Sequence, residues 1–249
     1  MSNKNPALFP ALLHSRNWIL ALMAFILVFA FENCGPTGPL ETDNYSSLSQ
    51  GSGNCALAPA ELRSPTSIDQ VTQLINALPK PLSVPCLIEN LPVPLKVYAV
   101  DGARSAQPSA GADSPRIFIM RGNLVLSVVP AGSGRNLLEY GQFINDRESV
   151  KAELTFPINQ AIQAAAPYNE ISANRGTTCR GCHTSERAIS GYGGNAFVSL
   201  VIRPDSSKRQ AATRLRSLAV QCDKATDPYR CEMLSAIYLT GQAQDAELP

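Results

Sequence analysis

The five-residue stretch Cys-Arg-Gly-Cys-His at positions 179–183 constrains this chain more than any other feature. If Cys179 and Cys182 share one helical turn, their spacing of three places both thiols on the same face, and His183 projects from that face too. Two thiols and an imidazole in this order are the pattern through which c-type haem is attached covalently. The only other histidine, His14, lies in a segment that we expect to be removed. We therefore expect one covalent haem c, with Cys179 and Cys182 bonded to the porphyrin and His183 as the proximal iron ligand.

Three other interpretations of the same residues stay open. Cys179 and Cys182 could form a small structural disulfide, with His183 incidental. They could also act as a thioredoxin-like redox pair, although no strand leads into the motif as that fold requires. A zinc site completed by Cys222 and Cys231 is the third possibility, although zinc sites usually take a more closely spaced second pair.

The first 33 residues predict a signal peptide. Lys4 and Arg16 give this segment positive charge, and an uninterrupted apolar run of fourteen residues extends from Trp18 to Phe31. Such a run is too short for a membrane span, which takes ~20 residues, but it fits the apolar core of a signal peptide. Two processing sites compete. The chain could be cleaved after Ala30, or Cys34 could become the lipidated first residue of a bacterial lipoprotein.

Residues 34–54 are rich in Gly, Ser and Asn and resemble the flexible tether of a lipoprotein. We therefore expect an exported protein of the periplasm or cell envelope, held at a membrane by a lipid on its tether. An oxidising compartment favours disulfides. Setting Cys34 and the motif aside leaves Cys55 with Cys86 and Cys222 with Cys231 as two expected disulfides, although spacing alone does not exclude other pairings.

Residues 55–156 predict a β-rich domain. A helical apolar pattern runs from Ile68 to Leu78, with Ser67 as its N-cap. Strand patterns follow at 95–100, 116–120, 124–129, 137–143 and 150–156, and a hairpin turn separates the second from the third. We expect these strands to form an antiparallel sheet, as a small sandwich or a curled half-barrel. The charged strand residues are predicted to be solvated and to form no catalytic site: Arg116, Arg121, Glu139 and Glu153.

Residues 157–249 predict a smaller, mostly helical domain. A short helix is expected at 158–166, and a strand or buried segment at 196–202. A helix capped by Asp205 or Ser206 should run through Gln221. The pair Asp227-Pro228 predicts the start of a last helix, which should end near Gly241.

From about Ile158 onward, the chain resembles a class I c-type cytochrome, on the basis of Thr177–Thr184 and the C-terminal helix. This resemblance implies an α+β protein, in which an antiparallel β-rich domain precedes a small, mostly helical cytochrome c-like domain. In the family an axial methionine normally precedes the last helix. Here the candidates are Met233, inside that helix, and Met120, in the strand region. We take Met233 as the expected sixth ligand. The alternatives are that Met233 is simply a core residue and that the sixth position is open.

The 21 basic and 20 acidic residues nearly balance, which argues against nucleic acid or an anionic surface as partner. The resemblance implies electron transfer or redox sensing through one haem, with a redox partner protein that the sequence does not identify. An open sixth position would instead favour small-ligand binding or peroxidase-like chemistry. The alternative is a cofactor-free envelope lipoprotein, stapled by disulfides that include Cys179–Cys182, with a binding or structural role.

Overall fold

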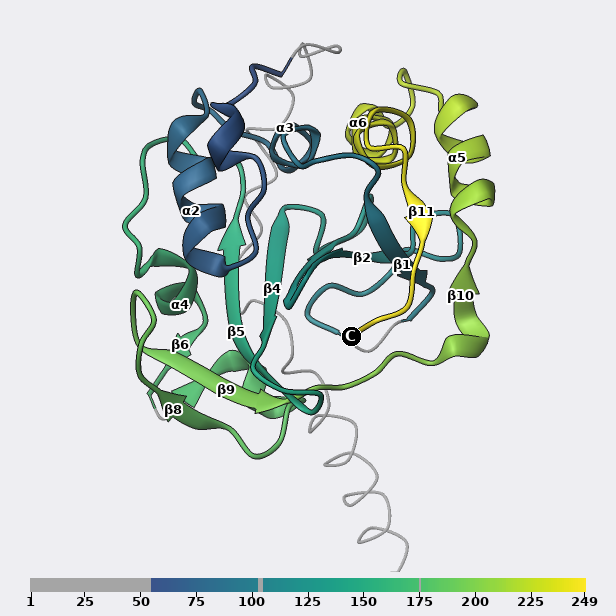
Figure 1. The fold of residues 1–249 in the computed structure, drawn as a ribbon. Helices are drawn as coiled ribbons and strands as arrows, with labels where there is room; N and C mark the ends of the chain where they lie inside the picture. The colour runs from purple at the N-terminus through teal and green to yellow at the C-terminus, as the bar shows by residue number, and fades with distance from the viewer. Residues whose placement is uncertain (1–54, 103–104, 175) are drawn as a thin grey trace, which may run out of the picture.

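The computed structural model describes residues 55–102, 105–174 and 176–249 (Figure 1). The expected signal peptide, the lipidation site Cys34 and the tether lie outside these described residues and stay predictions. Nine strands form one sheet in the order β10-β1-β2-β3-β4-β5-β9-β8, with β11 also pairing with β1. Neighbouring strands run antiparallel, except that β11 is parallel to β1. The described helices are all too short or too polar to cross a membrane.

The sheet centres on five strands close to those expected from the sequence. They are β1 (Lys96–Val100), β2 (Arg116–Arg121), β3 (Leu124–Val128), β4 (Leu137–Phe143) and β5 (Glu148–Thr155). The flanking strands are β8 (Arg187–Ile189), β9 (Ala196–Leu200), β10 (Arg209–Gln210) and β11 (Gln244–Asp245), while β6 (Ser172–Ala173) and β7 (Gly176–Thr177) form a separate hairpin. Gly122 makes the turn between β2 and β3 with a φ of +62°, a conformation that favours glycine.

Three of the five described α-helices, α2 (Ile68–Ala77), α3 (Val84–Glu89) and α6 (Pro228–Ser235), begin at a short polar side chain that caps them. The others are α4 (Ala166–Glu170) and α5 (Ala212–Val220), and α6 continues as a π-helical turn, η5 (Ala236–Thr240). The Ser67 side chain accepts a hydrogen bond from the Gln70 amide, and Asp227 accepts one from the Arg230 amide. Both caps confirm the sequence predictions and satisfy amides that have no partner within the helix.

The α+β expectation holds at the level of a mixed fold whose sheet is mostly antiparallel. A separate, cytochrome-like helical domain is not what the structure shows, because β9 pairs with β5 and both β10 and β11 pair with β1. The strands of 55–156 and of 157–249 therefore share one sheet. One continuous sheet takes the place of the expected sandwich of two packed sheets.

Two expected helices are interrupted by long-range hydrogen bonds. In the predicted helix 158–166, the backbone of Ile162 is held by both polar atoms of the Asn76 side chain, at 2.9 Å each, and only Ala166 enters a helix. In the predicted helix from Asp205 to Gln221, residues 209–210 pair with β1 as β10, so that α5 begins later. In both segments, hydrogen bonds to distant parts of the chain take the place of helical ones.

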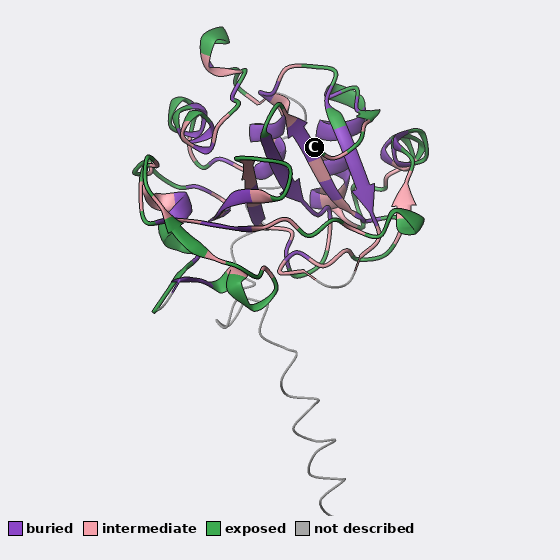
Figure 2. Cartoon of the chain, turned by 60° about the horizontal axis from the view of Figure 1, so that its bottom comes forward, coloured by how far each residue is buried: buried purple, intermediate pink, exposed green. Residues whose placement is uncertain are grey.

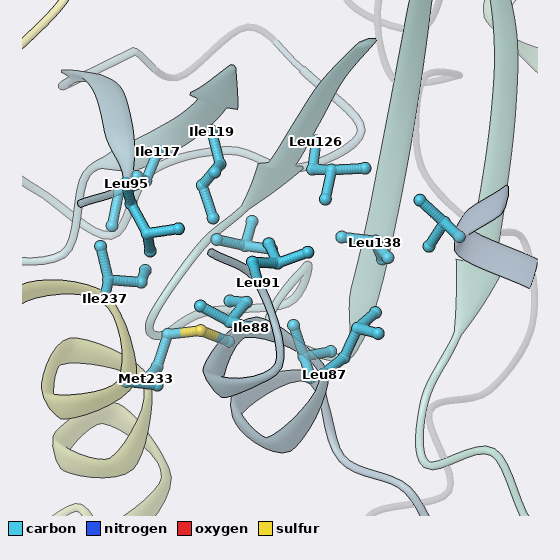
Figure 3. Packing of buried hydrophobic residues seen from close by; sticks show 14 of the residues in the cluster. Leu87, Ile88, Leu91, Leu95, Ile117, Ile119, Leu126, Leu138, Met233 and Ile237 are labelled. Atoms are coloured by element: carbon cyan, nitrogen blue, oxygen red, sulfur yellow. The ribbon is translucent and has the colours of Figure 1, made fainter. Parts of the chain in front are cut away.

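The helices cover one face of the sheet, and the main hydrophobic core lies between the helices and that face. Figure 3 shows Ile88, Leu91, Met233 and Ile237 packed against sheet residues such as Ile119. The buried residues are concentrated where the helices meet the sheet (Figure 2). We call the opposite face of the sheet the outer face. The outer face carries a smaller apolar cluster of Tyr98, Val100, Met120 and Val125, packed against Phe118 and Phe143.

Both expected disulfides, Cys55–Cys86 and Cys222–Cys231, are confirmed. The first ties the segment before α2 to α3, and the second joins the end of α5 to α6. These two bonds suggest a location outside the cytoplasm.

Candidate functional site around Cys179 and His183

The Cys-x-x-Cys-His residues form one compact turn, which we call the motif turn (residues 179–183). A 3₁₀ helix, η3 (Thr178–Gly181), carries the first cysteine. The Cys179 carbonyl accepts hydrogen bonds from the amides of Cys182, at 3.1 Å, and His183, at 2.8 Å. The Thr177 hydroxyl caps the turn by accepting from the Cys179 amide at 3.2 Å. The two cysteines and the histidine therefore occupy a single helical turn.

A carboxylate fixes the chain that enters the motif turn. The Glu186 side chain accepts hydrogen bonds from the amide of Thr177, at 2.9 Å, and from its hydroxyl. This approach needs a glycine at 176, where φ is +125° and a Cβ would lie only 2.1 Å from Glu186 Oε1. Neither Glu186 nor the role of Gly176 was predicted from the sequence. The glycine three residues before Cys179 was the available signal.

His183 is held in one tautomer by the sheet. Its Nδ1 lies 2.8 Å from the carbonyl oxygen of Leu200, at the end of β9. A carbonyl can only accept, so Nδ1 carries the proton and Nε2 keeps its lone pair. Burial lowers the pKa of His183 to about 4, and the positive charge of Lys151 acts in the same direction, against the Leu200 carbonyl. A neutral imidazole with Nε2 available is the form that binds a metal.

The two motif cysteines differ in their surroundings. Cys179 is half-buried and is the free thiol among the described residues. Burial raises the pKa of Cys179 to about 11, with Glu139 adding to the rise and the Thr177 hydroxyl opposing it. Cys182 is exposed and takes part in a disulfide. Because Cys179 is free, the structure contains no Cys179–Cys182 bond, which the structural-disulfide interpretation requires.

The motif turn lies near a polar part of the outer face. Val150, Ala152 and Leu154 of β5 point into the main core, so strand alternation places Lys151 and Glu153 on the outer face. Lys151 acts electrostatically on both Cys179 and His183. Four charged strand residues predicted to be solvated are in fact half-buried: Arg116, Arg121, Glu139 and Glu153.

Hydrogen bonds to neighbouring strands explain why the Arg116 side chain is half-buried. Its guanidinium pairs with Glu139 and bonds the Ser127 hydroxyl at 2.7 Å. The loop before β2 closes over this pair, because Ser105 bonds Arg116 and the fully buried Gln107 accepts from Ser127 at 2.9 Å. Sequence alternation alone would have placed these charges on one face. It could not reveal that a loop covers them.

Two carboxylates face each other in this polar region. Glu139 of β4 and Glu153 of β5 are directly paired across the strands, on the same face. Like charges in this position repel. Burial first, and then the charges of Glu139 and Glu170 against that of Arg116, raise the pKa of Glu153 to about 7. The site therefore contains a carboxyl group that takes up a proton near neutral pH.

Lys151 is the most deeply buried charged side chain of this region, at 8 % exposure. Its Nζ donates to the Ser149 hydroxyl at 2.6 Å. Burial lowers the pKa of Lys151 to about 8, although Cys179 and Glu139 act to raise it. The cross-strand neighbour of Ser149 is Ser199, whose hydroxyl oxygen is buried without a hydrogen-bond partner among the described residues.

The structure does not bring the expected methionine ligands to His183. Met233 is fully buried in the main core beside Ile88 and Ile237, on the helical side of the sheet (Figure 3). Met120 lies on the outer face but packs in the apolar cluster around Val125.

The zinc interpretation is wrong, because Cys222 and Cys231 bond each other. Within the described ranges, no group of three or more His, Cys, Asp or Glu side chains is arranged to hold a metal ion.

An open hollow of about 520 Å³ lies beside the β6–β7 hairpin, and no residue of the motif turn lines it. It is lined by the β6–β7 hairpin, by Ala188 and Ile189 of β8, and by residues 194–197.

No family model matches the chain, and comparisons with curated proteins and with solved structures found no match either.

Proposed function

We propose that the motif turn binds one covalent haem c, through thioether bonds from Cys179 and Cys182 and a proximal bond from His183. One observation carries this proposal. The Nδ1–H of His183 is bonded to the Leu200 carbonyl, which leaves Nε2 unprotonated in an imidazole kept neutral by burial. Iron-ligating histidines are typically oriented in this way by a partner on their other ring nitrogen.

Cys179 and His183 are in a state that suits the group, whereas Cys182 is not until its disulfide is reduced. The motif forms one helical turn, which sets both sulfur atoms and the imidazole at successive positions along it. Cys179 is a free thiol and can react directly. Cys182 is disulfide-bonded, so its bond would have to be reduced before attachment. When bound, the haem supplies one-electron chemistry at its iron. The Leu200 carbonyl orients the His183 imidazole, and charged side chains act on it electrostatically.

On this basis, we propose electron transfer or redox sensing in the periplasm or cell envelope, with a redox partner protein as the counterpart. The two disulfides support a compartment outside the cytoplasm. Export by the N-terminal segment and anchoring through a lipid on Cys34 are part of the same proposal. They rest on the sequence alone.

Intact mass tests the attachment. The full chain, expressed in a host with haem c attachment machinery, should exceed its polypeptide mass by one haem and give a pyridine haemochrome spectrum. Replacing Cys179 and Cys182 together with Ala should remove both signals. Replacing Cys222 and Cys231 with Ala is the matched control, since it removes the same number of cysteines and should leave the haem in place. Wild-type protein without added haem would refute the proposal.

A second candidate is a cofactor-free envelope lipoprotein with a binding or structural role. The disulfide at Cys182 favours it, because this bond removes one of the two thiols that haem needs. The raised pKa of Cys179 points the same way, since it reduces the reactivity of the other thiol. This candidate predicts a colourless protein in which Cys182 stays oxidised in any host, and peptide mapping under non-reducing conditions would show it.

A further inference from the structure

The two edges of the nine-stranded sheet are built differently. At one edge, the chain itself closes the sheet, because both β10 and β11 pair with β1. At the other edge lies β8, which pairs with β9 on one side and with no further strand of the described ranges on its other side (Figure 1). Unpaired backbone amides and carbonyls along such an edge can pair with another extended chain.

The residues of β8 lack the usual protection of an edge strand. Natural edges are commonly blunted by an outward charge, a proline or a bulge. The one charged residue of β8 is Arg187, and its guanidinium bonds the carboxylate of Glu148 on β5, two strands inward, at 3.0 Å. Ala188 and Ile189, which follow it, are uncharged. The edge is therefore open to a further strand.

The hollow of about 520 Å³ adjoins this edge. Ala188 and Ile189 contribute to its lining, as do Ala173 and Gly176 of the β6–β7 hairpin. The described residues that line it are all uncharged, and most of them are glycine, alanine or serine. Small side chains let another backbone approach closely, and an uncharged lining cannot neutralise a charged side chain. The hollow therefore suits an extended chain with small, uncharged side chains.

Close backbone contacts fix the walls of the hollow. In the turn between β8 and β9, a Cβ at Gly193 would lie 2.8 Å from the Ala164 carbonyl oxygen, and one at Gly194 would lie 3.1 Å from the Ala165 Cα. Residues 164–165 directly precede α4, and the β6–β7 hairpin follows α4 after one residue. Both walls are thus held by the same short segment. A site formed in advance reduces the ordering that binding must accomplish.

The concave shape distinguishes between two kinds of occupant. The lining comes from both strands of the β8–β9 pair and from a separate hairpin, so this end of the sheet is hollowed. Two copies of the chain related by a two-fold axis would present the same hollow to each other, and two hollows do not fill one another. A single extended segment can enter the hollow and pair with the edge strand.

We propose that β8 and the adjoining hollow bind an extended, uncharged segment of a partner protein, which adds a strand to the sheet. Main-chain hydrogen bonds to β8 supply the binding, and side chains that enter the hollow supply the preference for small, uncharged residues. The inference goes beyond the proposed function and does not depend on haem, since no residue of the motif turn lines the hollow.

The experiment measures binding of a fluorescent peptide, acetyl-Thr-Val-Thr-Ala-Thr-Val-Thr-amide, to the full-length protein by fluorescence anisotropy. Amide hydrogen exchange then maps the contact, and we expect slower exchange in β8 and in β6–β7. Ala188→Lys and Ala173→Lys each replace an exposed alanine, so both proteins should fold. Each should weaken binding about tenfold or more, because the added charge loses water without gaining a partner. Ala225→Lys is the matched control, since it adds the same charge at an exposed alanine between α5 and α6, far from β8 (Figure 1).

Two altered peptides test the chemistry of recognition. A peptide N-methylated at every residue has no backbone donor and should not bind, and one with lysine in place of threonine should bind more weakly. The proposal is overturned if the unmodified peptide does not bind, if the methylated peptide binds equally well, or if both lysine variants of the protein bind normally.

Two further outcomes would assign the edge to another occupant and would also overturn the proposal. One is a dimer of the wild type in sedimentation that Ala188→Lys dissociates, which indicates a second copy. The other is exchange protection of residues 34–54 in the free protein that Ala188→Lys removes, which indicates the tether of the chain itself.

Discussion

Replacing Glu153 with glutamine should change how the stability of the protein depends on pH. Glu153 is half-buried on the outer face and directly opposite Glu139. Its pKa rises from the ordinary value of 4.5 to about 7, first through burial and then through Glu139 and Glu170. The folded state therefore holds this proton at pH values where the unfolded chain has released it.

The sign follows from proton linkage. Between pH 4.5 and about 7 the folded state binds more protons than the unfolded state, so the free energy of unfolding falls as the pH rises. Across the whole window the loss from this one group amounts to about 3 kcal/mol as an upper bound, at roughly 1.4 kcal/mol per pH unit. A glutamine cannot ionise. Glu153→Gln should thus match the wild type near pH 4 and exceed its stability by up to about 3 kcal/mol above pH 7.

Urea unfolding at several pH values across this window measures the effect. His183 contributes a slope of the opposite sign, because its pKa falls to about 4 and its stabilisation grows as the pH rises from there toward 6.5. Wild type and Glu153→Gln both contain His183, so the difference between their unfolding free energies at each pH isolates the contribution of Glu153. Glu139→Gln serves as a second probe, since it removes the like charge and should shift the window for Glu153 to lower pH. A constant offset between wild type and Glu153→Gln would show that the reasoning is wrong.

Three further changes should have defined effects. Replacing Cys222 and Cys231 with Ser opens a cross-link between residues nine apart, and should lower the free energy of unfolding by about 2.5 kcal/mol in urea titrations; an unchanged midpoint would refute this. Asp227→Ala removes the N-cap of α6 and should cost ~1 kcal/mol by the same assay, whereas Asp227→Asn should cost much less. Gly176→Ala forces a Cβ onto the Glu186 carboxylate at a positive φ, and should lower both the melting temperature and the yield of attached haem. A normal yield in this last variant would show that the entry to the motif turn tolerates displacement.

The elements that the sequence predicted well are those decided by local patterns. β4 was expected at 137–143 and lies there, because its alternation and flanking turns identify it without help from the rest of the chain. The helix after Ser67 and the one after Asp227 have caps that act within four residues. The disulfide pairs were also accessible, since each joins cysteines that are neighbours in sequence once the motif is set aside.

The sequence could not reveal features that depend on contacts between residues far apart in the chain. The backbone at Ile162 is held by Asn76, 86 residues away, so a segment with a helical pattern is not helical. The same holds for the candidate site. The motif itself was evident, but the partners of His183 and the burial of Lys151 come from β9 and β5. A local pattern identifies the ligands of a site, whereas its electrostatic environment is set by the tertiary fold.

The pairing of β1 also has a consequence for the order of assembly. One edge of this strand pairs with β2, which follows it closely, but the other is closed by β10 and by Gln244–Asp245 of β11. While the chain is being synthesised, the part of that edge at Lys96 and Val97 stays open until almost 150 further residues have emerged, since Lys96 pairs with Gln244. An open strand edge is a template for wrong pairing. Holdase chaperones should therefore bind nascent chains that lack residues 244–245 far more than complete ones, and proteolytic removal of these residues should make the protein more prone to aggregate.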